Sequence, residues 1–435
     1  MIINHHPFTV NESGHLEIGG LDTVMLAEKY GTPLYVYDVS MIRNNARAFV
    51  QSFEALNVTA KVAYASKAFS SIAMLQVAKQ ENLCLDVVSE GELYTALQAD
   101  FPTDRIHLHG NNKSPREISM AIKNDIGCIV VDNFYDIDLI SQIAKDSGKK
   151  VSVLMRVTPG VESHTHEYIM TGNEDSKFGF DLQNGQAEEA FRLIEKQEHM
   201  HFMGLHCHIG SQIFETEGFK VATDLLFNEL IKWKIQYDYT PEVLNLGGGF
   251  GIRYTKEDEP LPHQTYVEGL VQAVKQHVQE MDIPMPEIWI EPGRSIVGNA
   301  GITLYTVGAM KNIPGIRNYI SVDGGMTDNI RPALYQAKYD AVVANKVNQQ
   351  ATDEVSVAGK CCESGDMLIW DLPVPKVEYR DILAVFSTGA YGYSMASHYN
   401  RLPKPAIVFV ENGEDKLVVK RETNEDITKN DLSYV

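Results

Sequence analysis

Four groups of residues in this chain have side chains or backbone that could perform chemistry, and each group follows an apolar, β-branched run. Lys67 lies in YASKAF, His206 and His208 lie in HCHIGS, three glycines lie in LNLGGGFG, and Glu291 opens EPGRS. In a parallel β/α barrel the reactive side chains come from the carboxyl ends of the strands. This placement predicts that the four groups meet at one mouth of a barrel.

Lys67 is a candidate for covalent chemistry. A lone lysine is most often a solvated surface residue, and that is the alternative interpretation. At the inner end of a strand, between small and apolar neighbours, its amine could be desolvated, stay neutral and form a Schiff base. The position of Lys67 therefore favours the covalent role.

The glycine run and the EPGR segment each have two interpretations. Gly247–Gly249 could make a tight turn with close packing, or their N–H groups could cradle a phosphate together with a helix N-terminus. Glu291 and Arg294 could form an ordinary surface ion pair. At a pocket mouth, the carboxylate could instead keep a pyridine nitrogen protonated while Arg294 binds a phosphate or carboxylate.

The histidines offer a rival function. His206 and His208 alternate on one strand face, as metal ligands do, and His164 and His166 form a second such pair. A barrel metallohydrolase is thus the alternative from another class of enzyme. A metal site does not explain the glycine run, the EPGR segment and the strand-end lysine. With a cofactor, His208 would stack on a flat ring.

The elements that must position these residues alternate between strand and helix. Apolar runs predict eight strands, and most of the intervening stretches have helical spacing. Near-continuous apolar runs suit strands buried on both faces, as in a closed parallel barrel. The predicted strands are 61–66, 85–89, 106–110, 128–132, 151–157, 202–210, 243–248 and 288–293, and the predicted helices are 71–80, 90–98, 115–124, 134–145, 186–196, 218–234 and 265–280.

The pattern changes after about residue 300, where short strand-like runs with turn residues between them indicate a β-rich domain. We therefore predict an α/β chain with a parallel (β/α)8 TIM-like barrel over residues 36–282 and a C-terminal β-rich domain over residues 283–435. The N-terminal segment 1–35 contains the extended HLEIGG and is expected to complete the β-domain.

Composition excludes several classes of partner. The 435 residues carry a formal net charge of −20, which would repel nucleic acid and anionic membranes. The N-terminus has neither the basic start nor the apolar stretch of a signal peptide, and no run of 18 apolar residues occurs. Five cysteines are poor material for a disulfide framework. We expect a cytoplasmic protein.

Ten blocks in order make the chain similar to a known family, the fold-type-III pyridoxal-phosphate decarboxylases. They are YASKA, LDVVSEGEL, HGNNKS, RVTPGVESHTHEYIMTG with SKFGF, GLHCHIGSQ, LNLGGGFG, EPGRS, DGGMTDNIRPALY, CCESGD and GAYGYSMASHYN, and they run from about residue 62 to 400. Ten ordered blocks are far more specific than any one of them. The resemblance implies an enzyme that uses pyridoxal 5'-phosphate.

The resemblance also implies a role for individual residues. Lys67 would be the Schiff-base lysine, His208 would stack on the ring, and Glu291 would pair with the pyridine nitrogen. Cys362 would be the proton donor. The phosphate would be bound by Ser211, Gly247, Gly248 and Gly249, with Gly293 and Arg294 near phosphate and substrate, Tyr391 at cofactor and substrate, and Arg331, Tyr335 and Glu363 on the substrate.

The resemblance implies a homodimer whose sites are shared, with Cys362 and Glu363 reaching the site of the neighbouring subunit, and no metal. A racemase of the same barrel class typically places an arginine at the ring nitrogen, so Glu291 favours decarboxylation. Arg331 and Arg294 suggest a second carboxylate on the substrate, and Glu363 suits an ammonium beside it. We therefore expect a substrate with an amino-acid group at each end, as in meso-diaminopimelate, and lysine as product. A catalytically dead, cofactor-binding regulator is a further alternative.

Overall fold

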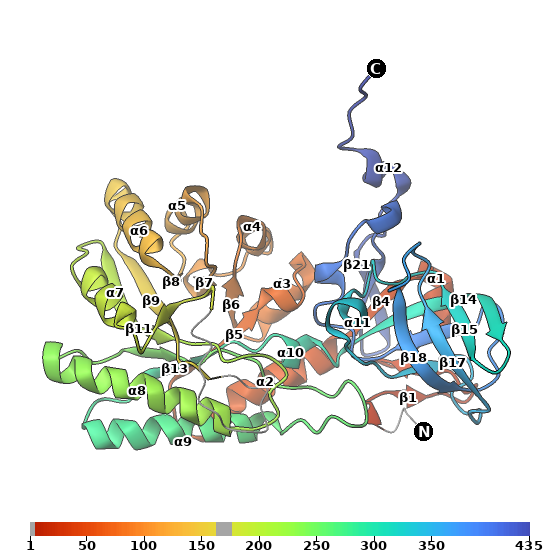
Figure 1. The fold of residues 1–435 in the computed structure, drawn as a ribbon, viewed down its shortest axis with the longest axis horizontal. Coiled ribbons are helices and arrows are strands. Elements are labelled where there is room, and N and C mark those ends of the chain that lie inside the picture. The colour runs from red at the N-terminus through yellow and green to blue at the C-terminus, as the bar shows by residue number, and fades with distance from the viewer. Residues whose placement is uncertain (1–4, 162–175) are drawn as a thin grey trace. The chain divides into compact units, whose positions relative to one another are not determined.

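The computed structural model describes residues 5–161 and 176–435, and the chain forms two compact units (Figure 1). We call Asn45–Gly251 with Pro260–Ser295 the barrel unit. The β unit comprises the chain up to Asn44, Ile252–Glu259 and Ile296–Val435. His164 and His166, the second pair in the metal hypothesis, lie outside the described residues.

The barrel unit contains the predicted closed parallel sheet. Its eight strands pair in sequence order, and β13 closes the ring by pairing with β5. All of these pairs are parallel, and β8 is buried along its whole length, as expected for a strand covered on both faces. The strands are β5 (Ala60–Ala65), β6 (Cys84–Val87), β7 (Ile106–Leu108), β8 (Cys128–Val131), β9 (Val151–Thr158), β11 (Met200–His206), β12 (Val243–Asn245) and β13 (Glu287–Ile290), and the short β10 (Phe180–Asp181) pairs with β9.

All seven predicted helices are present. Several begin at a residue whose side chain accepts a hydrogen bond from a free N–H of the first turn, among them Ser71, Ser89, Ser114 and Asn133. These caps fix where each loop from the barrel rim ends. The helices are α3 (Ile72–Gln80), α4 (Glu90–Gln98), α5 (Pro115–Lys123), α6 (Phe134–Ser147), α7 (Gln186–Glu195), α8 (Glu217–Tyr237) and α9 (His263–Met281), while α2 (Val39–Ala55) was not predicted.

The interior of the barrel is packed below the strand ends. A cluster of buried side chains from four strands, β8, β9, β12 and β13, fills it. This core leaves the carboxyl ends of the strands as the place where polar groups can meet. Its members are Cys128, Val130, Leu154, Val243 and Trp289.

The β unit is built on a sheet in the order β18-β17-β15-β14-β4-β20-β21, with β16 and β19 beside β14. The N-terminal segment supplies β4 to the middle of this sheet, and it also forms a three-stranded sheet and α1 (Thr23–Tyr30). The strands are β1 (Thr9–Val10), β2 (Leu16–Ile18), β3 (Leu21–Asp22), β4 (Leu34–Asp38), β14 (Gly301–Ile313), β15 (Arg317–Val322), β16 (Ala341–Val343), β17 (Asp353–Ala358), β18 (Met367–Val374), β19 (Ile382–Val385), β20 (Ala406–Glu411) and β21 (Glu414–Val419), with short helices α10 (Arg294–Val297), α11 (Arg331–Tyr335) and α12 (Asn424–Thr428).

The barrel unit extends to Ser295, beyond the expected boundary at residue 282, because β13 pairs with β12 on one side and β5 on the other. Among the described residues, no helix has the length and apolar character needed to cross a membrane.

Candidate active site

Three loops at the carboxyl ends of the barrel strands touch one another. The N–H of Ala65 donates to the carbonyl of Pro292 at 3.2 Å, and the N–H of Glu291 donates to the carbonyl of Gly247 at 2.8 Å. A Cβ on Gly293 would lie only 3.0 Å from the Cβ of Ala65. The EPGR loop therefore lies directly against the turn that carries Lys67 and against the glycine run.

Lys67 lies in a 3-10 turn, Ser66–Ala68, immediately after β5. Its two neighbours are buried, but the Lys67 side chain itself is exposed. The amine is thus solvated rather than desolvated, because the turn directs only the flanking residues into the core. Its charge nevertheless reaches the interior, where it acts on the pKa of both Asp86 and His208.

Glu291 is the centre of a buried polar cluster. Its side chain is 6% exposed, which contradicts the interpretation as a surface ion pair. Oε1 lies 3.1 Å from Nε2 of His109 and accepts a 2.6 Å hydrogen bond from Nδ2 of Asn245, and Oε2 lies 3.1 Å from Nε2 of His206. Asp86 Oδ1 lies 3.7 Å from the same His109 nitrogen.

The charges in this cluster follow from its contacts. Burial by itself raises the pKa of Glu291, but the imidazoles of His109 and His206 outweigh it and hold the pKa well below its usual range. Burial would lower the pKa of His109, but the carboxylates of Asp86 and Glu291 raise it. Burial lowers the pKa of His206 to about 4 despite Glu291. These contacts therefore favour the ionised form of Glu291, the charged form of His109 and the neutral form of His206.

His208 lies two residues past the end of β11, and its environment differs from that of His206. Burial and the charge of Lys67 lower the pKa of His208 to about 3, so the ring is neutral, and its Nδ1 accepts a 3.3 Å hydrogen bond from the N–H of Gly248. A neutral imidazole with a fixed orientation suits stacking on a flat ring. His206 instead groups with His109 and Glu291, whose ligand atoms lie within 4.8 Å of one another. The alternative interpretation, in which His206 and His208 form a metal-ligand pair, is not supported by this grouping.

The glycine run is required for packing. A Cβ on Gly247 would meet the carbonyl of Cys207 at 2.4 Å, one on Gly248 would meet the carbonyl of Glu291 at 2.1 Å, and one on Gly249 would meet the carbonyl of Gly210 at 2.3 Å. The run thus lies against the loops that carry His208 and Glu291. These contacts support the interpretation as a tight turn.

Ser211 and Arg294 form a direct contact beside this turn. Nη2 of Arg294 donates a 2.8 Å hydrogen bond to Oγ of Ser211. The pair combines a guanidinium fork with a hydroxyl, which are donor types that bind phosphate oxygens.

In the β unit, Arg331 begins α11 and is 8% exposed. Its surroundings are aromatic: Nη1 lies 2.5 Å from the hydroxyl of Tyr339, and the guanidinium lies 4.8 Å from the centre of the Tyr254 ring. Within residues 5–161 and 176–435, no carboxylate forms an ion pair with Arg331. A buried guanidinium with tyrosine neighbours has bonding capacity for an incoming carboxylate.

The CCESGD segment presents Cys362 and Glu363 at the surface of the β unit, whereas Cys361 is buried. The exposed thiol contradicts the alternative role of Cys362 as a buried small hydrophobe. The buried Asp366 anchors the segment, because its carboxylate accepts 2.7 Å hydrogen bonds from the N–H groups of Cys361 and Met326. One carboxylate thus joins the loop before Arg331 to the loop that carries Cys362.

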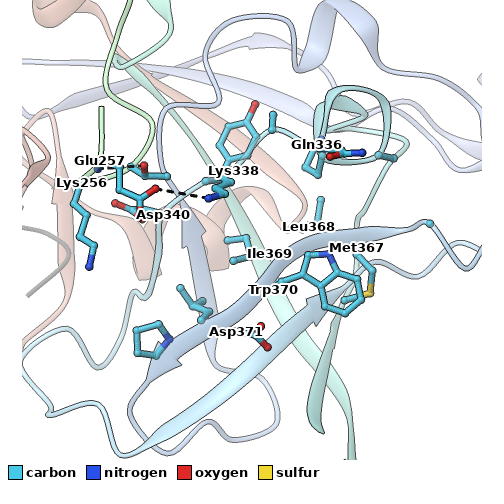
Figure 2. A pocket seen from close by; sticks show the side chains of 18 of the residues that line it. Lys256, Glu257, Gln336, Lys338, Asp340, Met367, Leu368, Ile369, Trp370 and Asp371 are labelled. Atoms are coloured by element: carbon cyan, nitrogen blue, oxygen red, sulfur yellow. Dashed lines mark hydrogen bonds and ion pairs between the residues drawn. The ribbon is translucent and has the colours of Figure 1, made fainter. Parts of the chain in front are cut away.

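The remaining predicted residues also lie in the β unit. Tyr335 ends α11 and is 60% exposed, and Tyr391 is partly buried with a φ of 57°. A cavity of about 870 Å³ lies in the β unit (Figure 2). It is lined by residues that follow Arg331 and Glu363 in the chain, including Pro332, Ser364 and Trp370 of β18, but by neither Arg331 nor Glu363.

The donor groups at the barrel rim fit pyridoxal phosphate. An exposed primary amine can bond an aldehyde, a buried carboxylate of low pKa can pair with a ring nitrogen, and the Ser211–Arg294 pair can bind phosphate. Consistent with this chemistry, the family model described as "Pyridoxal-dependent decarboxylase, pyridoxal binding domain" matches residues 39–298. The fold and the site thus define a barrel-type enzyme that uses pyridoxal phosphate to remove a carboxyl group.

Comparison with similar proteins identifies the family within this class of enzymes. The chain is 62% identical over 98% of its length to diaminopimelate decarboxylase of Bacillus subtilis and covers 97% of that protein, and it is 47% identical over 97% of its length to that of Staphylococcus aureus, covering 98% of it. The structure of diaminopimelate decarboxylase from M. jannaschii with L-lysine is 33% identical, with a TM-score of 0.92 over 100% of this chain and 99% of the other. This chain belongs to the diaminopimelate decarboxylase family.

The structure adds three residues that the sequence analysis did not select. Asp86, His109 and Asn245 surround Glu291, although Asp86 and His109 both lie in or beside the quoted blocks LDVVSEGEL and HGNNKS. Their polar character inside apolar strand runs was a usable signal. The sequence alone could not show that the three gather around Glu291, because they come from different strands.

Proposed function

We propose that this protein decarboxylates meso-2,6-diaminopimelate to L-lysine and CO2 with pyridoxal 5'-phosphate as cofactor, the last step of lysine biosynthesis. The observation that carries the proposal is the 62% identity over 98% of the chain to a diaminopimelate decarboxylase. The solved relative that contains L-lysine supports the product.

Residues of the barrel unit would hold the cofactor. When bound, pyridoxal phosphate supplies an electron sink for the breaking bond between Cα and the carboxyl group. Lys67 would bond the aldehyde, the ionised Glu291 would keep the ring nitrogen protonated, and His208 would lie against the ring face. The phosphate would be bound by Arg294 and by the glycine turn, with Ser211 and Gly293 alongside.

Residues of the β unit would bind the substrate. Arg331 would bind the distal carboxylate, which supports a substrate with an acidic group at both ends rather than a simple diamine precursor. Glu363 would bind the distal ammonium, and Tyr335 and Tyr391 would complete the contacts. Arg294 can bind the substrate as well as the phosphate.

Cys362 would deliver the proton that replaces CO2 at Cα. An exposed thiol on a segment anchored by Asp366 can present its proton without rebuilding the core. In this proposal the enzyme is a homodimer in which Cys362 and Glu363 act in the site of the partner subunit. A cytoplasmic location agrees with five cysteines that are all free, and the formal net charge of −20 disfavours nucleic acid and anionic membranes as partners.

The function is tested by substrate competition with the purified protein and cofactor. We expect turnover of meso-diaminopimelate, with far lower kcat/KM for lysine and ornithine, which lack the second carboxylate. Borohydride reduction should fix the cofactor on the peptide that contains Lys67. Preferred turnover of lysine or ornithine would contradict the proposed substrate, and a protein that binds the cofactor but turns over none of the three would be a regulator.

A further inference from the structure

His109 lies between two buried carboxylates, although the proposed reaction uses only one of them. Its Nε2 is 3.1 Å from Oε1 of Glu291 and 3.7 Å from Oδ1 of Asp86, and the three side chains are 5–7% exposed. We propose that His109 is a positioning residue whose positive charge keeps Glu291 ionised and oriented for the ring nitrogen, with Asp86 as the second counter-ion. This inference rests on the proposed function, because it assumes that Glu291 meets the ring.

The topology explains why one imidazole can join these groups. Asp86 lies on β6, His109 follows β7, and Glu291 follows β13, with β5 and β6 standing between β13 and β7 in the ring. The three residues are therefore brought together across the interior rather than along one strand. His109 is the connection between the β6–β7 side of the barrel and the EPGR loop.

His206 contacts Glu291 at the same distance but cannot perform this role. Only His109 lies near a second carboxylate, and that carboxylate raises the pKa of His109 while burial lowers the pKa of His206 to about 4. His206 and Asn245 thus act on Glu291 as neutral donors. Among the described residues, His109 is therefore the group in contact with Glu291 whose charged form is favoured.

The charge of His109 decides which group holds a proton. Two carboxylates in one buried site resist simultaneous ionisation, because each raises the pKa of the other. Without a cation between them, the pair of Glu291 and Asp86 would retain one proton. A protonated Glu291 cannot keep the ring nitrogen of the cofactor protonated. Other ionisable groups that interact electrostatically with the cluster are Glu92, His107, His206, His208, Arg156 and Lys67.

The test compares two glutamine variants. His109→Gln keeps an N–H donor near Glu291 and removes the charge. His107→Gln is the matched control, because His107 lies two residues away, is 1% exposed, stacks on Trp289 at 4.3 Å and has a pKa of about 3. The readout is the chemical shift of the ring nitrogen in holoenzyme that contains 15N-labelled pyridoxal phosphate, followed from about pH 6 to 9, together with kcat/KM.

We expect the ring nitrogen to stay protonated over this range in the parent and in His107→Gln. In His109→Gln it should lose its proton within the range, because an opposite charge within a few ångströms shifts a carboxyl pKa by about 1–3 units. We expect kcat/KM of His109→Gln to fall at least about tenfold at pH 8. His107→Gln should lose thermal stability without either change.

Equal ring-nitrogen titrations in the two variants would overturn the proposal. If His109→Gln does not fold, the titration of the histidine rings in the unaltered enzyme decides, with His107→Gln and His206→Gln used for assignment. A neutral His109 at pH 7 would overturn the proposal, and a charged one would support it. Failure of the proposed function is distinguishable, since the parent enzyme itself would then not form lysine.

Discussion

Replacement of Arg331 by alanine tests how the protein recognises the carboxylate at the distal end of the substrate. Arg331 is 8% exposed, so water screens its interactions little. A hydrogen bond to a charged group contributes about 1.5–3 kcal/mol, and a buried charge that loses its partner costs about 3–5 kcal/mol. A loss of about 3 kcal/mol corresponds to a fall of roughly 150-fold in kcat/KM for meso-diaminopimelate. Steady-state kinetics with detection of lysine measures this fall in kcat/KM for the Arg331→Ala variant.

Two further variants separate the charge from its surroundings. Arg331→Lys keeps the charge but not the planar fork, so its kcat/KM should lie between those of the parent and the alanine variant. Tyr339→Phe removes only the hydroxyl next to Nη1 and should cost less than about tenfold. Discrimination against lysine-like analogues should shrink in Arg331→Ala. Retention of the parent kcat/KM by that variant would refute this account of the distal carboxylate.

Three other predictions concern the lysine, the assembly and the buried histidines. Lys67→Ala should lose the visible absorption of bound cofactor and nearly all turnover, while its unfolding free energy stays within about 0.5 kcal/mol of the parent because the side chain is exposed; an unchanged absorption spectrum would contradict the role of Lys67. Mixing equal amounts of Lys67→Ala and Cys362→Ala chains, by co-expression or refolding, should recover roughly a quarter of parental activity, because half of the dimers have one intact site; mixed dimers without activity would mean that the sites are not shared in this way. The free energy of unfolding should fall as the pH drops from about 6.5 toward 4, since the unfolded chain binds protons that buried histidines such as His107, with a pKa of about 3, do not bind in the folded state. In denaturant titrations, His107→Gln should reduce the slope of the unfolding free energy against pH by about 1.4 kcal/mol per pH unit. An unchanged slope would argue against a neutral, buried His107.

Strand and helix order in the barrel could be predicted from the sequence because the strands are largely apolar runs, several of which, such as β6 and β8, are buried on both faces. The same reasoning missed β18, in which exposed residues such as Trp370 and Asp371 interrupt the apolar pattern, and α2, which precedes the first barrel strand. Strand ends were less predictable than strand positions. The run 202–210 was expected to continue to His208 and beyond, but β11 ends at His206.

For the site, the sequence identified the residues that are unusual for their local context, such as Lys67 and Glu291. It could not identify partners, because these depend on strand register and on the path across the barrel. His206 illustrates this limit: alternation suggested that it pairs with His208, whereas the structure pairs it with Glu291, 85 positions further along the chain. The hydrogen bond from the N–H of Cys361 to Asp366, which anchors the segment that carries Cys362, depended on loop geometry in the same way.

The most direct test of the central claim is the stoichiometry of the reaction on meso-diaminopimelate labelled with 13C in its carboxyl groups. With pyridoxal phosphate present, we predict one labelled CO2 for each L-lysine formed, and no CO2 after the cofactor has been removed. Consumption of meso-diaminopimelate without CO2, or formation of its stereoisomer alone, would contradict decarboxylation as the function of this protein.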